Sequence, residues 1–128
     1  MLGDRDAVAT IAVKDIEVAR KFYEGKVGLT PVPSEEASVL SYKSGSSTVL
    51  VYQSQFAGTN KATAATWAVG DVEREVQVLK DRGVAFERYD MPGTTHKGDV
   101  HIAGNRQVAW FKDPDGNILS IVAERADA

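Results

Sequence analysis

Two stretches of this chain are so alike that they indicate an internal duplication. Residues 8–17 (VATIAVKDIE) align with residues 64–73 (AATWAVGDVE), at an offset of 56 residues. Each copy begins with a short apolar run that suits a β-strand. Each then reaches an aspartate, Asp15 or Asp71, of the kind that caps a helix N-terminus. A repeated strand-and-helix unit therefore constrains the fold more than any other feature of the sequence.

The pattern after each capping aspartate predicts a helix. Apolar residues recur there at three- and four-residue steps, which predicts helices over residues 15–27 and 71–82. Gly28 and Gly83 stand where left-handed helix ends would fall. The remaining predicted strands are residues 29–32, 38–42, 48–52, 84–88, 100–103, 108–111 and 118–123. The interval 89–99 is predicted to be a long loop, and long loops in compact domains are often functional.

The length of 128 residues suits one domain. We expect a first module over about residues 6–53, a polar linker over about 54–62 and a second module over about 63–125. Net charge is −3 without a basic block, which argues against a nucleic-acid partner. The chain has no cysteine, no export signal and no long apolar run, so we expect a cytoplasmic protein that does not bind membranes.

Three motifs resemble the vicinal-oxygen-chelate superfamily, which includes glyoxalases, bleomycin-resistance proteins and extradiol dioxygenases. They are residues 13–29, residues 69–84 and the segment WFKDPDGNIL at residues 110–119. The resemblance implies an α+β fold of two tandem βαβββ modules, which form a cupped, partly open eight-stranded sheet with the helices outside. It also implies a ligand cavity inside the cup and a homodimer.

Metal-using members of this superfamily place ligands on the first and last strand of each half. The resemblance puts Val8, Ala64 and Ser120 at three of those positions, and the fourth falls near Val51, with Leu50 or Tyr52 as alternatives. A divalent ion needs imidazole nitrogen or carboxylate oxygen, which none of these residues provides. We therefore expect no metal and no other cofactor.

The two histidines leave further possibilities open. His101 lies on a predicted strand with Asp99 two residues before it, which makes the pair the best remaining metal candidate, while His96 lies in the predicted loop. Either histidine could instead carry out acid–base chemistry without a metal. The more common role is that of a surface or cavity-rim histidine, and we assign no catalytic residue.

Strand alternation predicts the wall of the cup. Residues 8, 10 and 12 share one face with residues 64, 66 and 68 of the repeat, whereas Trp67 falls on the opposite face. These small side chains would leave room for a guest molecule. The predicted ligand-binding residues are Val8, Thr10, Ala64, Thr66, Tyr52, Phe56, His101, Trp110 and Ser120.

We expect a metal-free protein that binds a small organic molecule and sequesters an aromatic or antibiotic-like compound. This resembles the bleomycin-resistance branch of the superfamily. The alternative is a lyase, an epimerase or a dioxygenase-type oxidoreductase of the same superfamily. The third possible function is that of an interaction module, in which the cup has a structural role and binds no small molecule.

Overall fold

The two aspartates at the ends of the repeat cap the two helices. In the computed structural model, which describes residues 1–34 and 36–124, Asp15 accepts hydrogen bonds from the backbone of Glu17 at 2.9 Å and Val18 at 3.2 Å. This cap begins α1 (Ile16–Arg20). Asp71 accepts from the backbone of Arg74 at 3.1 Å and begins α2 (Val72–Asp81). Both predicted helix starts are therefore correct.

The first helix does not remain an α-helix to its end. After α1 the backbone widens into a π-helical turn, η2 (Lys21–Lys26), in which Val27 donates to the carbonyl of Phe22 at 2.9 Å. The neighbouring residues Phe22 and Tyr23 are both buried there, and we attribute this to the wider turn. The helix predicted over residues 15–27 exists, but its second half follows a different hydrogen-bond pattern.

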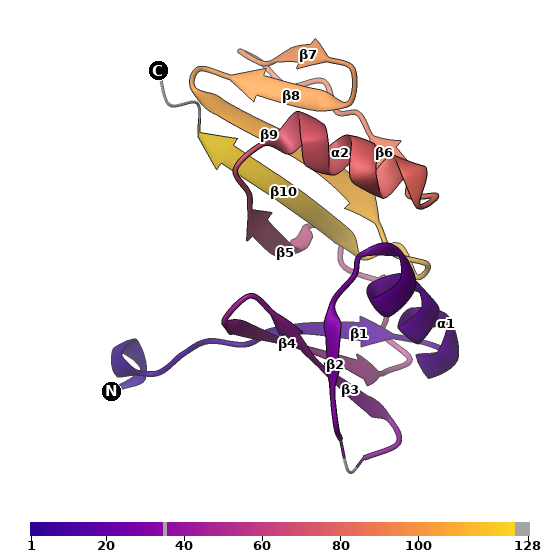
Figure 1. The fold of residues 1–128 in the computed structure, drawn as a ribbon. Helices are drawn as coiled ribbons and strands as arrows, with labels where there is room; N and C mark the ends of the chain where they lie inside the picture. Colours follow the sequence, from indigo (N-terminus) through magenta and orange to yellow (C-terminus); the bar gives the residue numbers. More distant parts are fainter. Residues whose placement is uncertain (35, 125–128) are drawn as a thin grey trace.

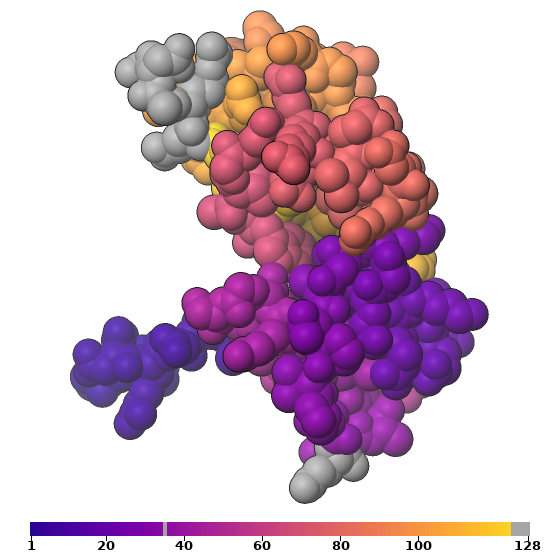
Figure 2. Space-filling model, viewed as in Figure 1, coloured from indigo at the N-terminus to yellow at the C-terminus, as the bar shows by residue number. Residues whose placement is uncertain are grey.

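The first half of the chain forms a four-stranded sheet, sheet 1. Its strands are β1 (Ala9–Val13), β2 (Thr30–Val32), β3 (Val39–Ser44) and β4 (Ser47–Gln53). They lie in the order β1-β4-β3-β2, with β1 parallel to β4 and the other pairs antiparallel. A short 3-10 turn, η1 (Leu2–Asp4), precedes them in a segment that projects from the body (Figures 1 and 2).

The second half forms sheet 2. Its strands are β5 (Thr63–Ala68), β6 (Phe86–Glu87), β7 (Thr95–Lys97), β8 (Val100–Ala103), β9 (Arg106–Lys112) and β10 (Ile118–Glu124). The order is β5-β10-β9-β8-β7, and β6 pairs with β9. Strand β7 corrects the loop prediction for residues 89–99. A tight turn at Gly98, whose φ is +60°, folds β7 back onto β8.

The α+β class is confirmed, but the single eight-stranded sheet is wrong. Strands β1 and β5 lie next to each other, yet no ladder of hydrogen bonds joins them among the residues described. The chain therefore has two sheets, one beside the other (Figure 1). The proposed module boundaries remain predictions, and the expected end of the second module, residue 125, lies outside the described residues.

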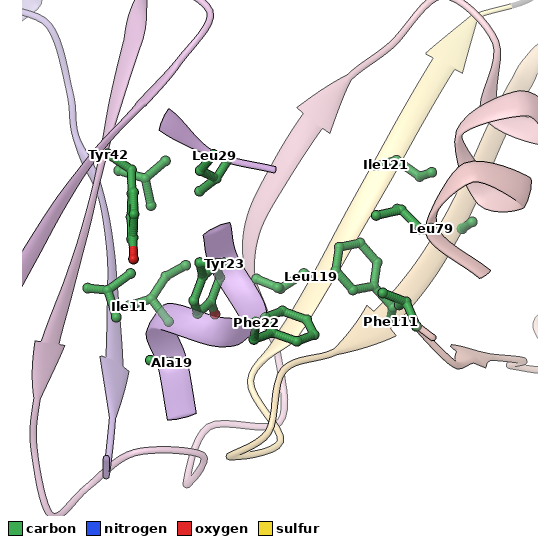
Figure 3. Close-up of a cluster of buried hydrophobic side chains, with 14 of the residues drawn as sticks. Ile11, Ala19, Phe22, Tyr23, Leu29, Tyr42, Leu79, Phe111, Leu119 and Ile121 are labelled. Carbon is green, nitrogen blue, oxygen red and sulfur yellow. The ribbon is translucent and has the colours of Figure 1, made fainter. Parts of the chain in front are cut away.

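Each sheet packs one face against a helix, and no helix of the described residues covers the other face. Ile11 and Val13 of β1 are buried under α1 with Tyr42 of β3, and Leu119 and Phe111 are buried on the corresponding side of sheet 2. We call this side of each sheet the helix face and the opposite side the open face. The two helix faces share one core, because the aromatic ring of Phe22 lies 6.4 Å from that of Phe111 (Figure 3).

A buried carboxylate joins the two halves at the turn between β9 and β10. The hydroxyl of Tyr23, in the first half, donates to Oδ2 of Asp113 at 2.6 Å. Nδ2 of Asn117 donates to the same oxygen at 2.8 Å and also to the carbonyl of Ala12 in β1 at 2.7 Å. Burial and the Asp113 charge raise the pKa of Tyr23 far above its ordinary value. The phenol therefore stays protonated and keeps its role as donor.

The linker between the halves packs closely against the same turn. Gly58 has a φ of +71°, and a Cβ at this position would lie 1.9 Å from the carbonyl oxygen of Asp115. Only glycine fits this approach. Asp115 also accepts a hydrogen bond from the backbone of Lys14 at 3.1 Å. The turn therefore holds both the end of β1 and the linker.

Replacing Tyr23 by phenylalanine tests this junction. Asp113 would lose one of its buried donors, which costs about 2 kcal/mol when the acceptor is charged. We expect the urea midpoint of unfolding to fall accordingly. The control is Tyr52→Phe, because Tyr52 is exposed on β4 and should change stability by less than about 0.5 kcal/mol. Equal midpoints for the two variants would show that the Tyr23–Asp113 bond does not stabilise the fold.

Candidate functional site

A row of polar and aromatic side chains crosses the open face of sheet 2. Ser120 of β10 lies opposite Thr66 of β5 on one side and opposite Trp110 of β9 on the other. The hydroxyls of Thr66 and Ser120 are 2.7 Å apart and hydrogen-bonded. The indole Nε1 of Trp110 donates to the hydroxyl of Thr63 at 3.3 Å. The structure thus brings together three of the predicted ligand-binding residues.

An aromatic cluster continues from Trp110 towards the edge of the sheet. The ring of His101 lies 4.7 Å from that of Trp110 and 4.6 Å from that of His96, edge to face in both cases. Tyr89 completes the cluster, with its ring 5.3 Å from Trp110. We refer to Tyr89, His96, His101 and Trp110 as the aromatic cluster.

The two histidines hold the backbone of Tyr89 from both sides. Nε2 of His101 accepts a hydrogen bond from the Tyr89 N–H at 2.9 Å, and Nε2 of His96 donates to the Tyr89 carbonyl at 3.0 Å. These bonds dock the segment after β6 onto the open face and cover His101, which is only 1% exposed. Both histidines therefore act first as positioning residues.

His101 is held in its neutral form. Burial lowers the pKa of its imidazole below the ordinary value, and the nearby His96 lowers it further. The backbone groups of Val108 and Asp99 offset this only in part, because Nδ1 is buried without a hydrogen bond of good geometry. A neutral ring is also what the bond from Tyr89 requires, since Nε2 must carry a lone pair.

The other predicted site residues are not brought to this cluster. Val8 lies before β1 and is 43% exposed, and Thr10 bonds only the carbonyl of Val8, at 3.3 Å. Tyr52 lies on the open face of sheet 1, and Phe56 is exposed in the linker. Ala64 is exposed and lies in β5, two residues before Thr66. The predicted set is thus divided between sheet 1, the linker and sheet 2.

The strand register identifies the fourth position of the expected metal site. Leu50 lies opposite Thr10 in sheet 1, just as Ser120 lies opposite Thr66 in sheet 2. Val51 points into the buried helix face, so Leu50 is the counterpart of Ser120. The only ligating atom among Val8, Leu50, Ala64 and Ser120 is one hydroxyl, which is already bonded to Thr66. These residues do not fit a divalent metal.

The alternative metal pair is also separated by the structure. The Asp99 carboxylate accepts a hydrogen bond and ion pair from Lys80 of α2 at 2.8 Å, away from the aromatic cluster. Within residues 1–34 and 36–124, no group of three or more histidine, cysteine, aspartate or glutamate residues could hold a metal ion. The chemistry of the site therefore comes from aromatic rings, hydroxyls and nearby charges.

A hollow of about 460 Å³ adjoins the aromatic cluster at the β9–β10 end of the open face. The linker forms one wall and sheet 2 the other, and we call this hollow the linker pocket. Its lining residues are Gly58, Asn60, Lys61, Tyr89, Lys112, Gly116 and Ile118. A volume of this size suits a small organic molecule.

Two other hollows lie away from the aromatic cluster. In one of about 440 Å³ beside α1, Glu24 accepts a hydrogen bond from Tyr42 at 2.8 Å and lies 3.5 Å from Arg20. In another of about 260 Å³ between the halves, the indole of Trp67 donates to Ser44 at 2.8 Å. Neither hollow is lined by a residue of the aromatic cluster, whereas Tyr89 lines the linker pocket, which favours the linker pocket as the binding site.

Sequence reasoning missed Tyr89 and the two lysines of the linker pocket. Tyr89 belongs to the segment predicted as a loop, and its place depends on bonds to residues 7 and 12 positions away. Lys112 could have been found, because alternation places it on the same face as Trp110. Lys61 carries no such signal, since it lies in a linker without periodicity.

The fold and the site define a class of α+β domain in which each of two sheets carries one helix and leaves its other face open. Here sheet 2 bears the aromatic cluster, and the expected metal positions lack ligands. The family model described as Glyoxalase/Bleomycin resistance protein/Dioxygenase superfamily matches residues 6–121. The chain belongs to this superfamily, as the sequence resemblance indicated.

Solved structures show the same fold. The glyoxalase family protein from Enterococcus faecalis aligns with a TM-score of 0.72 at 18% identity, covering 95% of this chain and 99% of that one. A glyoxalase/bleomycin resistance protein/dioxygenase from Alicyclobacillus acidocaldarius aligns with a TM-score of 0.70 at 15% identity, covering 97% and 94%. No curated protein matches the sequence significantly. The part of the chain that the structure describes contains no helix long and apolar enough to span a membrane.

Because the side chains at the expected metal positions cannot ligate a divalent ion, we predict that the purified protein holds no stoichiometric divalent metal. We expect elemental analysis to find far less than one nickel, zinc, iron or manganese ion per chain. Chelator treatment should leave the melting temperature unchanged, because no metal contributes to folding. About one ion per chain, lost together with stability on chelation, would contradict this and make His96 the first residue to mutate.

The buried neutral His101 predicts a loss of stability in acid. Its pKa is lowered in the folded protein, so the unfolded chain binds more protons as pH falls below the ordinary value of 6.5. The stabilisation linked to neutral His101 is fully present above pH 6.5 and is lost as the pH falls towards the lowered pKa of the folded protein. We expect His101→Gln, which can still accept from Tyr89, to show a weaker dependence of the urea midpoint on pH between 7 and 5. Parallel curves for variant and wild type would exclude this role.

Proposed function

We propose that this protein binds a small, largely apolar and aromatic molecule on the open face of sheet 2, without a metal. The main observation is the aromatic cluster beside the linker pocket, with the indole of Trp110 next to the Thr66–Ser120 hydroxyl pair. Aromatic side chains provide large apolar contact area, and a few fixed hydroxyls orient a guest. Sequestration of an aromatic or antibiotic-like compound is the role that fits this chemistry.

The arrangement supports binding over catalysis. A general base needs a free lone pair within reach of the substrate, but Nε2 of His101 already accepts from Tyr89. His96 donates through Nε2 to the Tyr89 carbonyl, so the lone pair on its Nδ1 is the one left for proton transfer by the two histidines. No geometry of the described side chains favours lyase, epimerase or dioxygenase chemistry. We also propose that the protein is a homodimer in the cytoplasm, as expected from the sequence, and light scattering tests the dimer.

A thermal-shift screen of small aromatic compounds tests the proposal. A ligand that binds only the folded state stabilises it by about 2.7 kcal/mol at roughly 100 times its Kd. We expect at least one compound to raise the melting temperature by several degrees. Trp67→Phe leaves Trp110 as the only tryptophan, so that its fluorescence reports occupancy on titration with the best compound.

Matched threonine variants locate the site. Thr66→Phe should weaken binding about tenfold or more by filling space beside Ser120, whereas Thr10→Phe makes the same change on sheet 1 and should leave the affinity unchanged. Equal losses would place the ligand across both sheets, as the cup predicted from sequence requires. Wild-type affinity in both variants would remove the open face as the site.

A further inference from the structure

The linker pocket carries positive charge in a protein whose overall charge is negative. Lys61 and Lys112 line it, although the net charge of the chain is −3. No aspartate or glutamate belongs to the lining. Its apolar surface comes from Ile118 and the ring of Tyr89. The lining of the pocket therefore combines apolar surface with two lysine side chains.

These lysines are only partly neutralised by other residues. Nζ of Lys112 lies 3.3 Å from a carboxylate oxygen of Glu87, but the two side chains are 47% and 35% exposed, so this pair is weak. Lys61 makes no ion pair with any residue in the described ranges 1–34 and 36–124. An anion in the pocket would meet both ammonium groups without displacing a strong internal bond.

The lining has one further polar side chain with free groups, Asn60. Tyr89 lines the pocket through its accessible atoms only, because its hydroxyl is buried and makes no hydrogen bond among the described residues. Oδ1 of Asn60 already accepts one hydrogen bond, from the backbone of Ala62 at 2.9 Å, while within the described ranges both N–H groups of its amide remain free to donate. The polar groups left in the pocket are therefore mostly donors.

The pocket is continuous with the proposed aromatic site. Lys112 and Trp110 are two residues apart on β9 and share the open face, which separates them by about 7 Å. Tyr89 contacts both regions, since it lines the pocket and packs edge-on against Trp110. One molecule could thus place a ring against Trp110 and Tyr89 and an acidic group between the lysines.

We propose that the ligand is an aromatic carboxylic acid, or an aromatic molecule with an equivalent anionic group, whose charge is recognised by Lys61 and Lys112. This inference rests on the proposed function and specifies its ligand class. Charge-assisted hydrogen bonds from ammonium groups are the interaction that selects the anion over a neutral analogue.

Three biphenyl compounds of nearly equal shape test the charge preference at pH 7. They are biphenyl-4-carboxylate, biphenyl-4-carboxamide and the cationic biphenyl-4-methylamine, each titrated into the full chain by calorimetry and by saturation-transfer NMR. We expect the carboxylate to bind about tenfold more tightly than the amide. We expect the amine to bind most weakly. Raising salt from 50 to 500 mM should weaken only the carboxylate towards the affinity of the amide.

Lysine variants assign the preference to this pocket. Lys61→Gln/Lys112→Gln should bind carboxylate and amide equally, with the amide affinity close to that of wild type. The matched control is Lys97→Gln, which removes a lysine of β7 that is paired with Glu73 at 3.1 Å outside the pocket. The control should keep the carboxylate preference. Circular dichroism and the urea midpoint verify folding, and the salt dependence of wild type tests the charge preference without any variant.

The outcomes separate this inference from the function on which it rests. Equal binding of all three compounds to wild type would overturn the anion preference and leave aromatic binding intact. A carboxylate preference that survives in the double lysine variant would place the anion elsewhere and overturn the assignment to Lys61 and Lys112. Failure of all three compounds, together with a negative aromatic screen, would contradict the proposed function itself.

Discussion

The buried carboxylate of Asp113 is the interaction on which the arrangement of the two halves depends. It receives the hydroxyl of Tyr23 from the first half and the amide of Asn117 from its own turn, and Asn117 also reaches the carbonyl of Ala12. Since no ladder joins β1 to β5 in the described ranges, these polar bonds and the shared core set how the sheets meet. A buried charge with several donors is stable only while all of them stay in place, so the junction has one geometry.

The shape of the binding region depends on this junction between the two halves. The turn after Asp113 positions Asp115, against whose carbonyl Gly58 packs too closely for any Cβ. That contact holds the linker beside the end of sheet 2 and creates the wall that carries Lys61. On the other side, the two histidines fix Tyr89. The linker pocket therefore lies between two segments without long strands of their own, each anchored by a specific polar or steric contact.

The sequence predicted those features that depend on local periodicity. The repeat located both capped helices, and alternation placed Thr66 and Trp67 on opposite faces of their strand. The strand register, which the sequence does not show, adds Trp110 and Ser120 to the Thr66 face. The sequence did not predict the separation into two sheets, because the absence of a ladder between β1 and β5 in the described residues depends on how the strand edges meet in space. Strand β7 was missed because three residues beside Gly98 give too little pattern, although the turn at Gly98 was a usable signal. Tyr89 was missed since its bonds to His96 and His101 are distant in sequence, and Lys61 was missed since the contact of Gly58 with Asp115 sets the course of the linker.

The position of the charges explains why the ligand is assigned to one end of sheet 2. At the centre of the expected metal site, Val8, Leu50, Ala64 and Ser120 leave a single hydroxyl, and that group is already bonded to Thr66. An anionic ligand that a metal would otherwise hold must find its countercharge in the protein. Of the regions continuous with the aromatic cluster, only the linker pocket combines two lysines with a lining free of carboxylates. The proposed recognition of an acid thus depends on Lys61 and Lys112, because the expected metal positions carry no ligand. It requires no residue beyond those that already form the pocket.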